Sequence, residues 1–587
     1  MASGGVVRGS IRAIAAFPPR PREATRYFRS LDAWSLGVWV VAAAAAALRW
    51  HGINAEGLWL DEIASYEYAV QRYGSAVELV TTVPTVDPHP PLYYLLLRWW
   101  AGLFGTTEVA LRSLSAALSV ATVLFVYLLA VKLFDSRATG HLASAFVAAS
   151  AMHVYFAQEA RMYALLTLLT VASFYWYVDL VLADDVRPAS VSRYVAATAL
   201  LGYAHTFAVF LILAQNVFAL VLARREVATD GDGRLGWIPR LRRSDLFRRW
   251  VGYQVVVGAL LAPWLALLAA HALELPLVAY STTDWIPSPS LAYFFRAPRA
   301  YLFYSVREFR FFAHPWVVWP AIGLAAAALL RFNPDADPED DADEIELGYS
   351  DRSLLLAVWL AVGTVVPLVL SYLLDPIYRH KYTIGASLAF FLMAARGVEK
   401  LDANYSRWFA YGLAALVVVA AAGSLGGIYD AQQKPDWREG IAELEAEAGD
   451  SALVVTSPGF VAGPIEYYAD GDRTTIRAIP KNATWNGTLS AVVGDRPTVW
   501  LAVSTWYIER GQVQYLLNEF EDGGYERLMR GALAEERRGD SPRAVLEYGV
   551  VAYELHWTGE GENGTQNVVP PRVRTPTATG LGVAANR

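Results

Sequence analysis

Two adjacent carboxylates stand out near the start of the chain. Asp61 and Glu62 occur in the sequence GLWLDEIASYEYA, where tryptophan, leucine and isoleucine flank them. Ionised groups beside an apolar, membrane-level surface are costly to keep there and tend to be functional. A carboxylate in such a place is a candidate general base. The structural alternative is that both acids begin a helix, whose dipole stabilises negative charge at its N-terminus.

A second polar pair follows in the same stretch. The sequence DPHPPLYYLLLRWW, residues 87–100, places Asp87 and His89 just before Pro90 and Pro91 and a short apolar run. This run is too short to cross a membrane, so we expect an interfacial helix with its aromatic side chains at headgroup depth. Asp87 and His89 are candidates for a substrate cavity, and turn chemistry ahead of proline is the alternative.

Further polar residues interrupt the apolar sequence at two short turns. The turn FAQEARMYALL contains Gln158, Glu159, Arg161 and Tyr163, and the turn GYAHTFAVF contains His205. Ionisable residues at membrane depth predict a functional site, and we assign all five to the substrate cavity or its edge. A structural salt bridge between Glu159 and Arg161, and simple packing of His205, are the alternatives.

Three consecutive cations form a further cluster. Arg379, His380 and Lys381 lie in DPIYRHKYTIG, between two apolar stretches. The expected topology places them outside the cytoplasm, which runs against the positive-inside rule and requires an explanation. An anionic headgroup provides one, because arginine binds phosphate oxygens bidentately and lysine adds a point charge. Arg161 is a further candidate ligand of the same phosphate.

Long apolar stretches must position all of these residues. The 587-residue chain is 55% hydrophobic and only 18% charged, against roughly a quarter charged in ordinary globular chains. A transmembrane helix needs about 20 mostly apolar residues. Eleven candidate stretches are present: 33–50, 111–134, 139–157, 161–183, 191–204, 205–223, 251–272, 315–331, 353–374, 381–400 and 408–428. The predicted fold class is therefore a polytopic α-helical membrane protein with about 11 transmembrane helices.

Arginines predict the orientation of these helices. Six arginines in residues 1–32 place the N-terminus in the cytoplasm, and eleven crossings then place the residues after the last span outside. The loop 224–250 carries eight arginines and falls inside, as the positive-inside rule requires. We therefore expect a multi-pass protein of the cell membrane whose active site and C-terminal domain are extracytoplasmic.

The residues after about 430 differ in character. Runs rich in β-branched residues at 452–457, 498–504 and 549–557 alternate with helical patterns at 437–448 and 511–521. This alternation is typical of a small α/β domain. The predicted organisation is a basic cytoplasmic segment, a membrane domain that includes an outer loop 51–110, an extracytoplasmic α/β domain and a disordered tail: 1–32, 33–430, 431–565 and 566–587.

Several of these motifs, in this order, resemble one enzyme superfamily. LWLDE, DPHPPLYYLLLRWW, ALRSLSAAL, FAQEARMYALL, YAHTFAVF and IYRHKY resemble the GT-C glycosyltransferases, in their protein mannosyltransferase-like (dolichyl-phosphate-mannose type) branch. The resemblance covers roughly residues 33–430. It implies transfer of a sugar, such as mannose, from a polyprenyl (dolichyl) phosphate to a glycan, protein or lipid acceptor outside the cytoplasm.

The resemblance also implies residue roles. Asp61 matches the acid of the first outer loop that acts as the catalytic base, and Glu62 is the neighbouring acid. A single in-line displacement would invert the anomeric configuration. The charge of the departing phosphate would be stabilised by the cations Arg379, Lys381, His380 and Arg161.

The sequence gives no sign of a cofactor. No glycine-rich phosphate loop follows a predicted strand, so no cofactor is predicted, although one set of side chains could hold a divalent metal: Asp61, Asp87, His89 and Glu159. The net charge of −7 argues against a nucleic acid partner. Two other function classes stay open, a transporter or flippase of a lipid-linked sugar and a surface receptor or scaffold built around the outer domain.

Overall fold

The chain is described here from a computed structural model. It describes residues 32–85, 87, 89–183, 185–228, 241–274, 286, 288–304, 315–330, 350–430, 434–448, 452–480, 482–504, 510–527 and 550–557. Nearly all of the predicted N-terminal segment 1–32, parts of the arginine-rich loop 224–250 and the predicted tail 566–587 lie outside these residues.

The described residues form two units with an unexpected boundary. The first unit runs to Ile53 and from Tyr68 to Ala431, and the second combines Asn54–Glu67 with the residues from Gln432 onward. The sequence analysis assigns the whole loop 51–110 to the membrane domain. The structure instead groups its Asn54–Glu67 part with the C-terminal residues, because α4 (Leu60–Tyr66) packs on α22 (Ala462–Tyr468).

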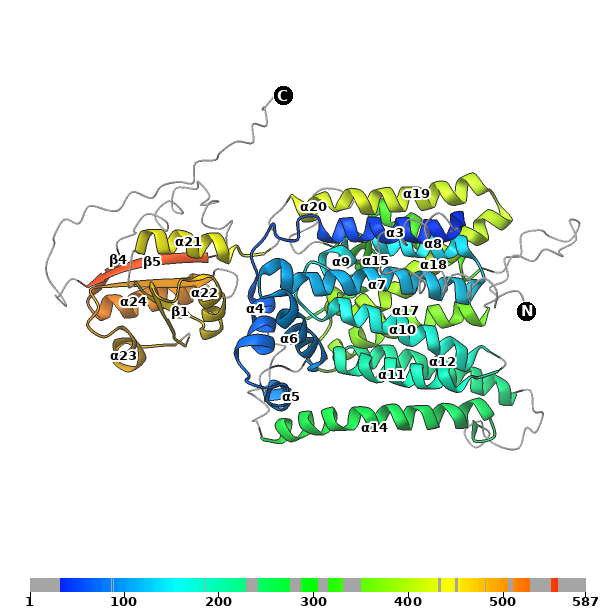
Figure 1. Cartoon of the computed structure of the whole chain (residues 1–587), viewed down its shortest axis with the longest axis horizontal. Coiled ribbons are helices and arrows are strands. Elements are labelled where there is room, and N and C mark those ends of the chain that lie inside the picture. The colour runs from blue at the N-terminus through cyan, green and yellow to red at the C-terminus, as the bar shows by residue number, and fades with distance from the viewer. Residues whose placement is uncertain are drawn as a thin grey trace, which may run out of the picture. The chain divides into compact units, whose positions relative to one another are not determined.

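The first unit is a bundle of long apolar helices that run side by side (Figure 1). Among the described residues, seven helices are long and apolar enough to cross a membrane: α3 (Ala33–Trp50), α7 (Glu108–Phe134), α10 (Tyr163–Val181), α12 (Ala208–Ala228), α14 (Asp245–Glu274), α17 (Asp351–Leu373) and α19 (Arg407–Ser424). This unit also contains helices that do not meet both conditions, being either shorter or, in α18, richer in charge: α5 (Ala76–Thr82), α6 (Leu92–Phe104), α8 (Arg137–Ala149), α9 (Ala151–Tyr155), α11 (Pro188–Ala204), α15 (Ala292–Phe303), α16 (Pro315–Ala327), α18 (Ile384–Asn404) and α20 (Gly426–Tyr429). The predicted polytopic helical class is confirmed, and the exact number of crossings stays a prediction.

Two of the predicted spans differ in detail. The stretch 139–157 is not one helix, because Ser150 has an extended ψ of 121° and caps α9 through its hydroxyl group. The stretch 381–400 begins as a 3-10 turn, His380–Thr383, and continues as α18 to Asn404. The second break contains the predicted site residues His380 and Lys381.

Apolar side chains on the outer helices of the bundle are exposed. They include Trp34 and Val40 on α3, Val255 on α14, and Trp408 and Val419 on α19. A soluble protein buries most such side chains, whereas a helix bundle in lipid exposes them to the hydrocarbon.

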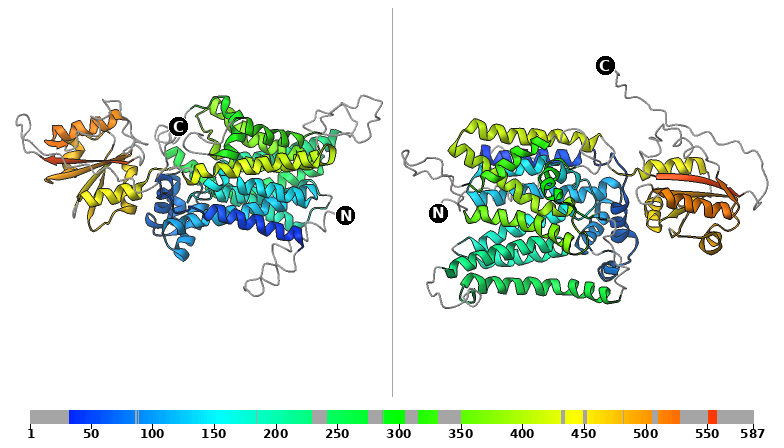
Figure 2. Two further views of the ribbon diagram at one scale, coloured as in Figure 1. Left: turned by 90° about the horizontal axis from the view of Figure 1, so that it is seen from above. Right: turned by 180° about the vertical axis from the view of Figure 1, so that it is seen from behind.

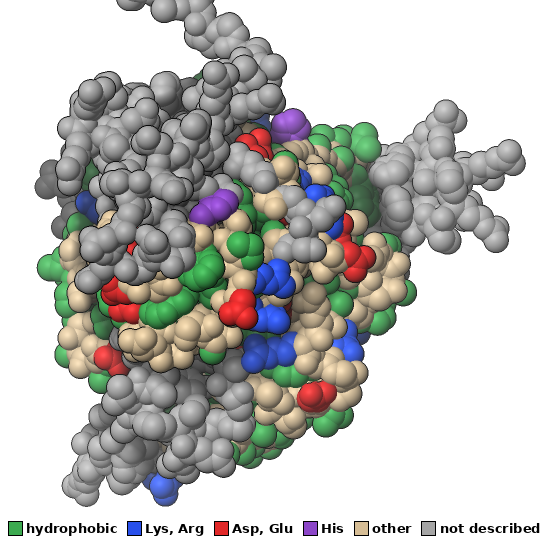
Figure 3. Space-filling view, turned by 90° about the vertical axis from the view of Figure 1, so that its left-hand side faces the viewer, with side chains coloured by type: hydrophobic (Ala, Val, Ile, Leu, Met, Phe, Trp, Pro, Cys, Tyr) green, Lys and Arg blue, Asp and Glu red, His purple; other side chains and the backbone are tan. Residues whose placement is uncertain are grey.

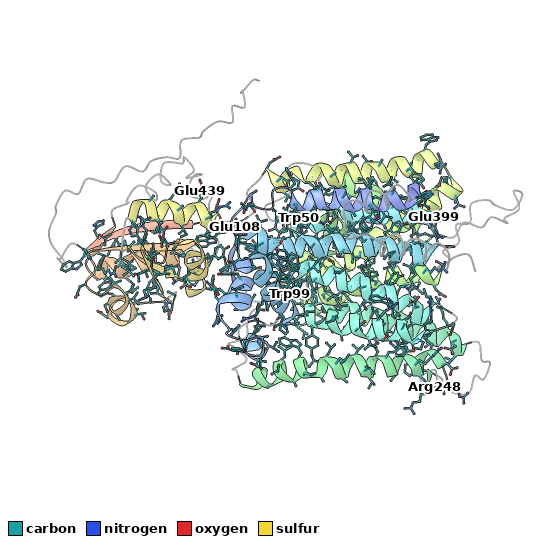
Figure 4. The ribbon with its side chains drawn as sticks, in the orientation of Figure 1. Trp50, Trp99, Glu108, Arg248, Glu399 and Glu439 are labelled. Carbon is teal, nitrogen blue, oxygen red and sulfur yellow. The ribbon has the colours of Figure 1, made fainter. Side chains whose placement is uncertain are left out.

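The two ends of the bundle carry different side chains. Figure 4 shows Arg248 and Glu399 at one end and Trp50, Trp99 and Glu108 at the other. We call these the arginine end and the tryptophan end. Helices α10 and α12 begin at the tryptophan end and α18 begins there as well, so the turns before them bring the predicted site residues of this unit to that end.

The second unit contains a five-stranded sheet in the order β2-β1-β3-β5-β4. Its strands are β1 (Ala452–Ser457), β2 (Thr474–Ala478), β3 (Thr498–Ser504), β4 (Tyr525–Arg527) and β5 (Val550–Trp557). The first three are parallel, with Val454 opposite Trp500, whereas β5 is antiparallel to both of its neighbours. The three predicted strands and both predicted helices are confirmed, and the short strands β2 and β4 are additions.

Helices cover both faces of this sheet (Figure 2). One face packs on α21 (Trp437–Ala448) and α22, and the other on α23 (Ser490–Val493) and α24 (Arg510–Asp522). Successive residues of β1 alternate between the two cores, as strand geometry requires: Leu453 and Val455 face one, Val454 the other. On the surface shown in Figure 3, Lys and Arg side chains are interspersed with Asp and Glu, as is usual for a surface in contact with water.

Candidate active site

The adjacent acids Asp61 and Glu62 lie in the first turn of α4 and have different environments. Both benefit from the helix dipole at this position. Because successive helical residues are rotated by about 100°, their side chains leave the helix in different directions. Glu62 is completely buried, whereas Asp61 is half-buried. Of the two carboxylates, only that of Asp61 is accessible from outside the protein.

Glu62 is held by contacts within the second unit. Its Oε2 accepts a hydrogen bond from Lys434 Nζ at 3.2 Å and one from the Trp59 backbone N–H at 3.4 Å. Lys434 is only 4% exposed. A buried, ion-paired carboxylate is poorly suited to exchange protons with a substrate, so these contacts favour Asp61 over Glu62 as the reacting acid.

In the first unit, Asp87 and His89 are hydrogen-bonded to each other before α6 begins. His89 Nδ1 lies 2.5 Å from Asp87 Oδ1, and the His89 backbone N–H donates to the same oxygen at 2.8 Å. Burial alone would raise the pKa of Asp87, but His89 and Arg161 outweigh it and hold this pKa well below its usual range. Asp87 is therefore ionised at neutral pH and fixes the orientation of the His89 ring.

Arg161 and Tyr94 extend this pair. The Tyr94 hydroxyl donates to Asp87 Oδ2 at 2.7 Å, and Arg161 Nη1 donates to the Tyr94 oxygen at 3.5 Å. Arg161 is only 6% exposed. The buried guanidinium group of Arg161 is thus linked through Tyr94 to the carboxylate of Asp87. Charged groups that are removed from water need such partners.

Aromatic rings connect this network to the cations before α18. The ring of His205 lies 5.1 Å from that of His89, 5.7 Å from that of Tyr163 and 5.7 Å from that of Tyr382, measured between centroids. Lys381 Nζ lies over both tyrosine rings, 5.7 Å from Tyr163 and 5.4 Å from Tyr382. Within the described part of the chain, the buried Nε2 of His205 has no hydrogen-bond partner.

Electrostatic interactions connect two more predicted site residues, Glu159 and Arg379, with these rings and cations. Tyr304, after α15, interacts with Lys381, Arg379 and Glu159. His205 interacts with Arg161 and Lys381, and burial together with these positive charges lowers its pKa well below the usual value. We call the following residues the anion cluster: Asp87, His89, Glu159, Arg161, Tyr163, His205, Arg379 and Lys381.

Two predicted site residues have other contacts. Gln158 donates hydrogen bonds to the backbone oxygens of Arg49 at 3.2 Å and His51 at 2.6 Å, so it fastens the end of α3. The ring of His380 is stacked on that of Tyr293 at 5.1 Å, and its Nε2 contacts the Tyr293 backbone oxygen at 3.0 Å. Neither residue joins the anion cluster through these contacts.

Sequence reasoning missed several contributors. Tyr94 and Tyr382 lie in motifs that were singled out, but only as interfacial or flanking aromatics. Nothing in the sequence marks Lys434 as a contributor, because its partner Glu62 is 372 positions away. In the described part of the chain, no three His, Asp or Glu side chains are grouped to hold a metal ion.

One family matches a large part of the first unit. Residues 88–231 match the sequence model of the family described as "Dolichyl-phosphate-mannose-protein mannosyltransferase". This range contains most of the anion cluster and follows directly after Asp87. The resemblance to GT-C glycosyltransferases is confirmed. Among curated proteins, none matches the chain significantly.

Several solved structures are similar to this chain. ArnT from Cupriavidus metallidurans in the apo state has a TM-score of 0.55 at 13% identity, covering 88% of this chain and 97% of that chain. The same protein bound to undecaprenyl phosphate has a TM-score of 0.53, with the same identity and coverage. The oligosaccharyltransferase of Archaeoglobus fulgidus in the apo form has a TM-score of 0.46 at 12% identity, covering 80% of this chain and 69% of that chain. At such identities the two ArnT structures establish the fold alone.

Proposed function

We propose that this protein is a membrane glycosyltransferase that transfers one sugar from a polyprenyl (dolichyl) phosphate to an extracytoplasmic acceptor. One observation carries the proposal: a helix bundle of GT-C fold gathers the buried Arg161, the half-buried Arg379 and Lys381 and several aromatic rings at its tryptophan end. A phosphosugar needs both features, because cations bind its phosphate and aromatic rings pack against its sugar. Residues 33–430 would form the membrane domain, and the C-terminal residues an extracytoplasmic α/β domain.

The proposed donor site uses the cations of the anion cluster. Lys381 and Arg379 would bind the phosphate oxygens, since charge-assisted hydrogen bonds to phosphate are short and strong. Arg161 would add a third positive charge, and it is already oriented through Tyr94. His380 would contribute less, because its ring is stacked on Tyr293. The ArnT structure bound to undecaprenyl phosphate makes a polyprenyl phosphate a natural ligand for this fold.

The proposed reaction is a single displacement at the anomeric carbon. Asp61 accepts the proton of the acceptor hydroxyl as its oxygen forms the new glycosidic bond. The bond between the anomeric carbon and the phosphate oxygen breaks, and the polyprenyl phosphate leaves with its negative charge stabilised by the cations. Attack from the face opposite the phosphate inverts the anomeric configuration.

The orientation that we propose for the protein in the membrane follows from the arginines near the end of α12 and the start of α14. Arg224 and Arg225 at the end of α12, and Arg242 and Arg243 before α14, lie at the arginine end of the bundle. The positive-inside rule places that end in the cytoplasm. The tryptophan end, with the donor site, then faces outward, as the transfer to an outside acceptor requires.

A reconstituted transfer assay tests this function. The purified full chain in lipid nanodiscs is mixed with dolichyl phosphates carrying tritiated mannose, glucose or galactose, and with membranes of a strain that lacks the gene. We expect the label of one donor to become covalently attached to membrane glycan, protein or lipid. A flippase would move intact donor across the bilayer of proteoliposomes without consuming it, and that result would overturn the proposal. Mass spectrometry of surface glycans from the same deletion strain would then identify the missing sugar.

A further inference from the structure

The short helix that carries Asp61 is built into the second unit. Helix α4 has only seven residues, and isolated helices shorter than about 12 residues are marginal in water. Its position must therefore come from tertiary contacts. Tyr66 packs edge-on against Tyr467 of α22, with 5.0 Å between ring centroids, and the Leu58 backbone N–H donates to the Tyr468 hydroxyl at 2.5 Å.

Helix α4 lies so close to α22 that position 463 of α22 has no room for a side chain. A Cβ atom added to Gly463 would lie 1.9 Å from Glu67 Oε1 and 3.1 Å from Ile63 Cγ2. Arg438 of α21 also donates to the backbone oxygens of Asn54 and Ala55, at 3.4 and 3.3 Å. Both ends of the segment Asn54–Glu67 thus have partners among the C-terminal residues.

The strongest of these contacts is the ion pair of Glu62 with Lys434. Both side chains are buried, and lysine is almost never fully buried unless it is paired. Lys434 precedes α21 and belongs to the part of the chain that leaves the last membrane helix. Glu62 also accepts from the backbone N–H of Trp59, so the pair fixes the first turn of α4 at its backbone.

We propose that Lys434, through its ion pair with Glu62, positions Asp61 for proton abstraction, so that the C-terminal unit is required for catalysis. The inference rests on the proposed function. It follows because Asp61 and Glu62 are consecutive residues of one helical turn, and a turn that rotates about its axis moves both side chains. Glu62 and Lys434 are positioning residues in this account. Asp61 is the group that reacts.

The experiment compares Lys434→Met with the wild-type chain in the transfer assay, using dolichyl phosphate mannose or whichever labelled donor the wild type consumes. We expect kcat to fall by about tenfold to a hundredfold, because small misplacements of a catalytic group have effects of this size. The KM for the donor should stay within about twofold, since the cations proposed to bind the phosphate are unchanged. Lys434→Arg, which keeps the positive charge, should restore most of the lost kcat.

A matched control separates positioning from general stability. Lys132 pairs with Asp179 at 2.8 Å and is also largely buried, on α7 and α10 of the first unit. Lys132→Met should lower the melting temperature but leave the kcat of the folded protein near the wild-type value.

The outcomes distinguish two failures. If the wild type transfers none of the labelled sugars, the proposed function fails and this inference fails with it. If the wild type is active and folded Lys434→Met has a kcat within about twofold of it, the positioning role alone is overturned.

Discussion

The two ends of the helix bundle differ in how far their charged side chains are exposed to solvent. At the arginine end, Arg225 and Asp351 form an ion pair whose side chains are 52% and 47% exposed. At the tryptophan end, Glu159 and Arg161 are 1% and 6% exposed. Exposed ion pairs contribute about 0–1 kcal/mol to folding, whereas removing a charge from water costs several kcal/mol. We interpret the exposed charges of the first end as signals for membrane topology, and the buried charges of the second as groups that bind and react.

Among the effects on binding and on stability, the largest is expected for donor binding. Replacing both Arg379 and Lys381 by alanine should weaken binding of dolichyl phosphate by about a hundredfold or more. Each charge-assisted hydrogen bond contributes roughly 1.5–3 kcal/mol, and about 1.4 kcal/mol is a factor of ten in affinity. Native mass spectrometry of the chain in detergent, titrated with dolichyl phosphate, measures the change.

The matched control for that double variant lies at the arginine end. Arg248 and Arg249 are also neighbouring cations, and replacing both by alanine removes the same net charge. Its affinity for dolichyl phosphate should equal that of the wild type. Equal losses at both ends would show that net charge, and not the anion cluster, attracts the lipid.

The next effect concerns the folded state. Asp87→Asn should lower the free energy of unfolding by about 2 kcal/mol, because His89 and Tyr94 lose an ionised acceptor. Folding lowers the pKa of Asp87 below its ordinary value of 3.8. The stabilisation by the ionised carboxylate is therefore fully present above that pH, and it is lost as the pH falls through the lowered pKa. Unfolding monitored at pH 7 and at about pH 3 should therefore show a smaller difference between the two proteins at the lower pH.

Removing one hydroxyl of the same network has a smaller expected effect. Tyr94→Phe keeps the ring and its contacts but deletes the hydroxyl between Asp87 and Arg161. We expect a loss of about 1 kcal/mol in unfolding free energy, the usual size for one hydrogen bond. An unchanged melting curve would indicate that this hydroxyl does not link the two charges.

The smallest effect is expected at the arginine end. Asp351→Asn breaks the exposed pair with Arg225 and should change the unfolding free energy by less than about 1 kcal/mol. A loss as large as that of Asp87→Asn would remove the contrast between the two ends.

The sequence predicts which polar residues lie together at one end of the bundle but not the directions of their side chains. Polar residues are conspicuous in an apolar background, and alternating helix directions alone assign the turns at 157–162, 205–207 and 379–383 to one end of the bundle. The directions of the side chains cannot be predicted in this way, because they depend on local packing. His380 and Lys381 are neighbours, yet one stacks on Tyr293 and the other lies over Tyr382.

The domain boundary could not be predicted for a related reason. Nothing in the sequence GLWLDEIASYEYA shows that it packs on α22 rather than on its neighbours in the chain. The contacts that decide it are made by residues far away, such as Tyr467 and Lys434. Hydrophobic periodicity identifies a helix, but long-range packing decides to which unit a short helix belongs.

The reacting acid is tested most directly by single-turnover transfer with three purified chains: wild type, Asp61→Asn and Glu62→Gln. With excess enzyme and labelled donor, Asp61→Asn should bind donor normally and transfer sugar at least about a thousandfold more slowly, since it lacks the base. Glu62→Gln should keep a measurable fraction of the wild-type rate. Transfer by folded Asp61→Asn at close to the wild-type rate would contradict the account, because the reaction would then not need the Asp61 carboxylate as its base.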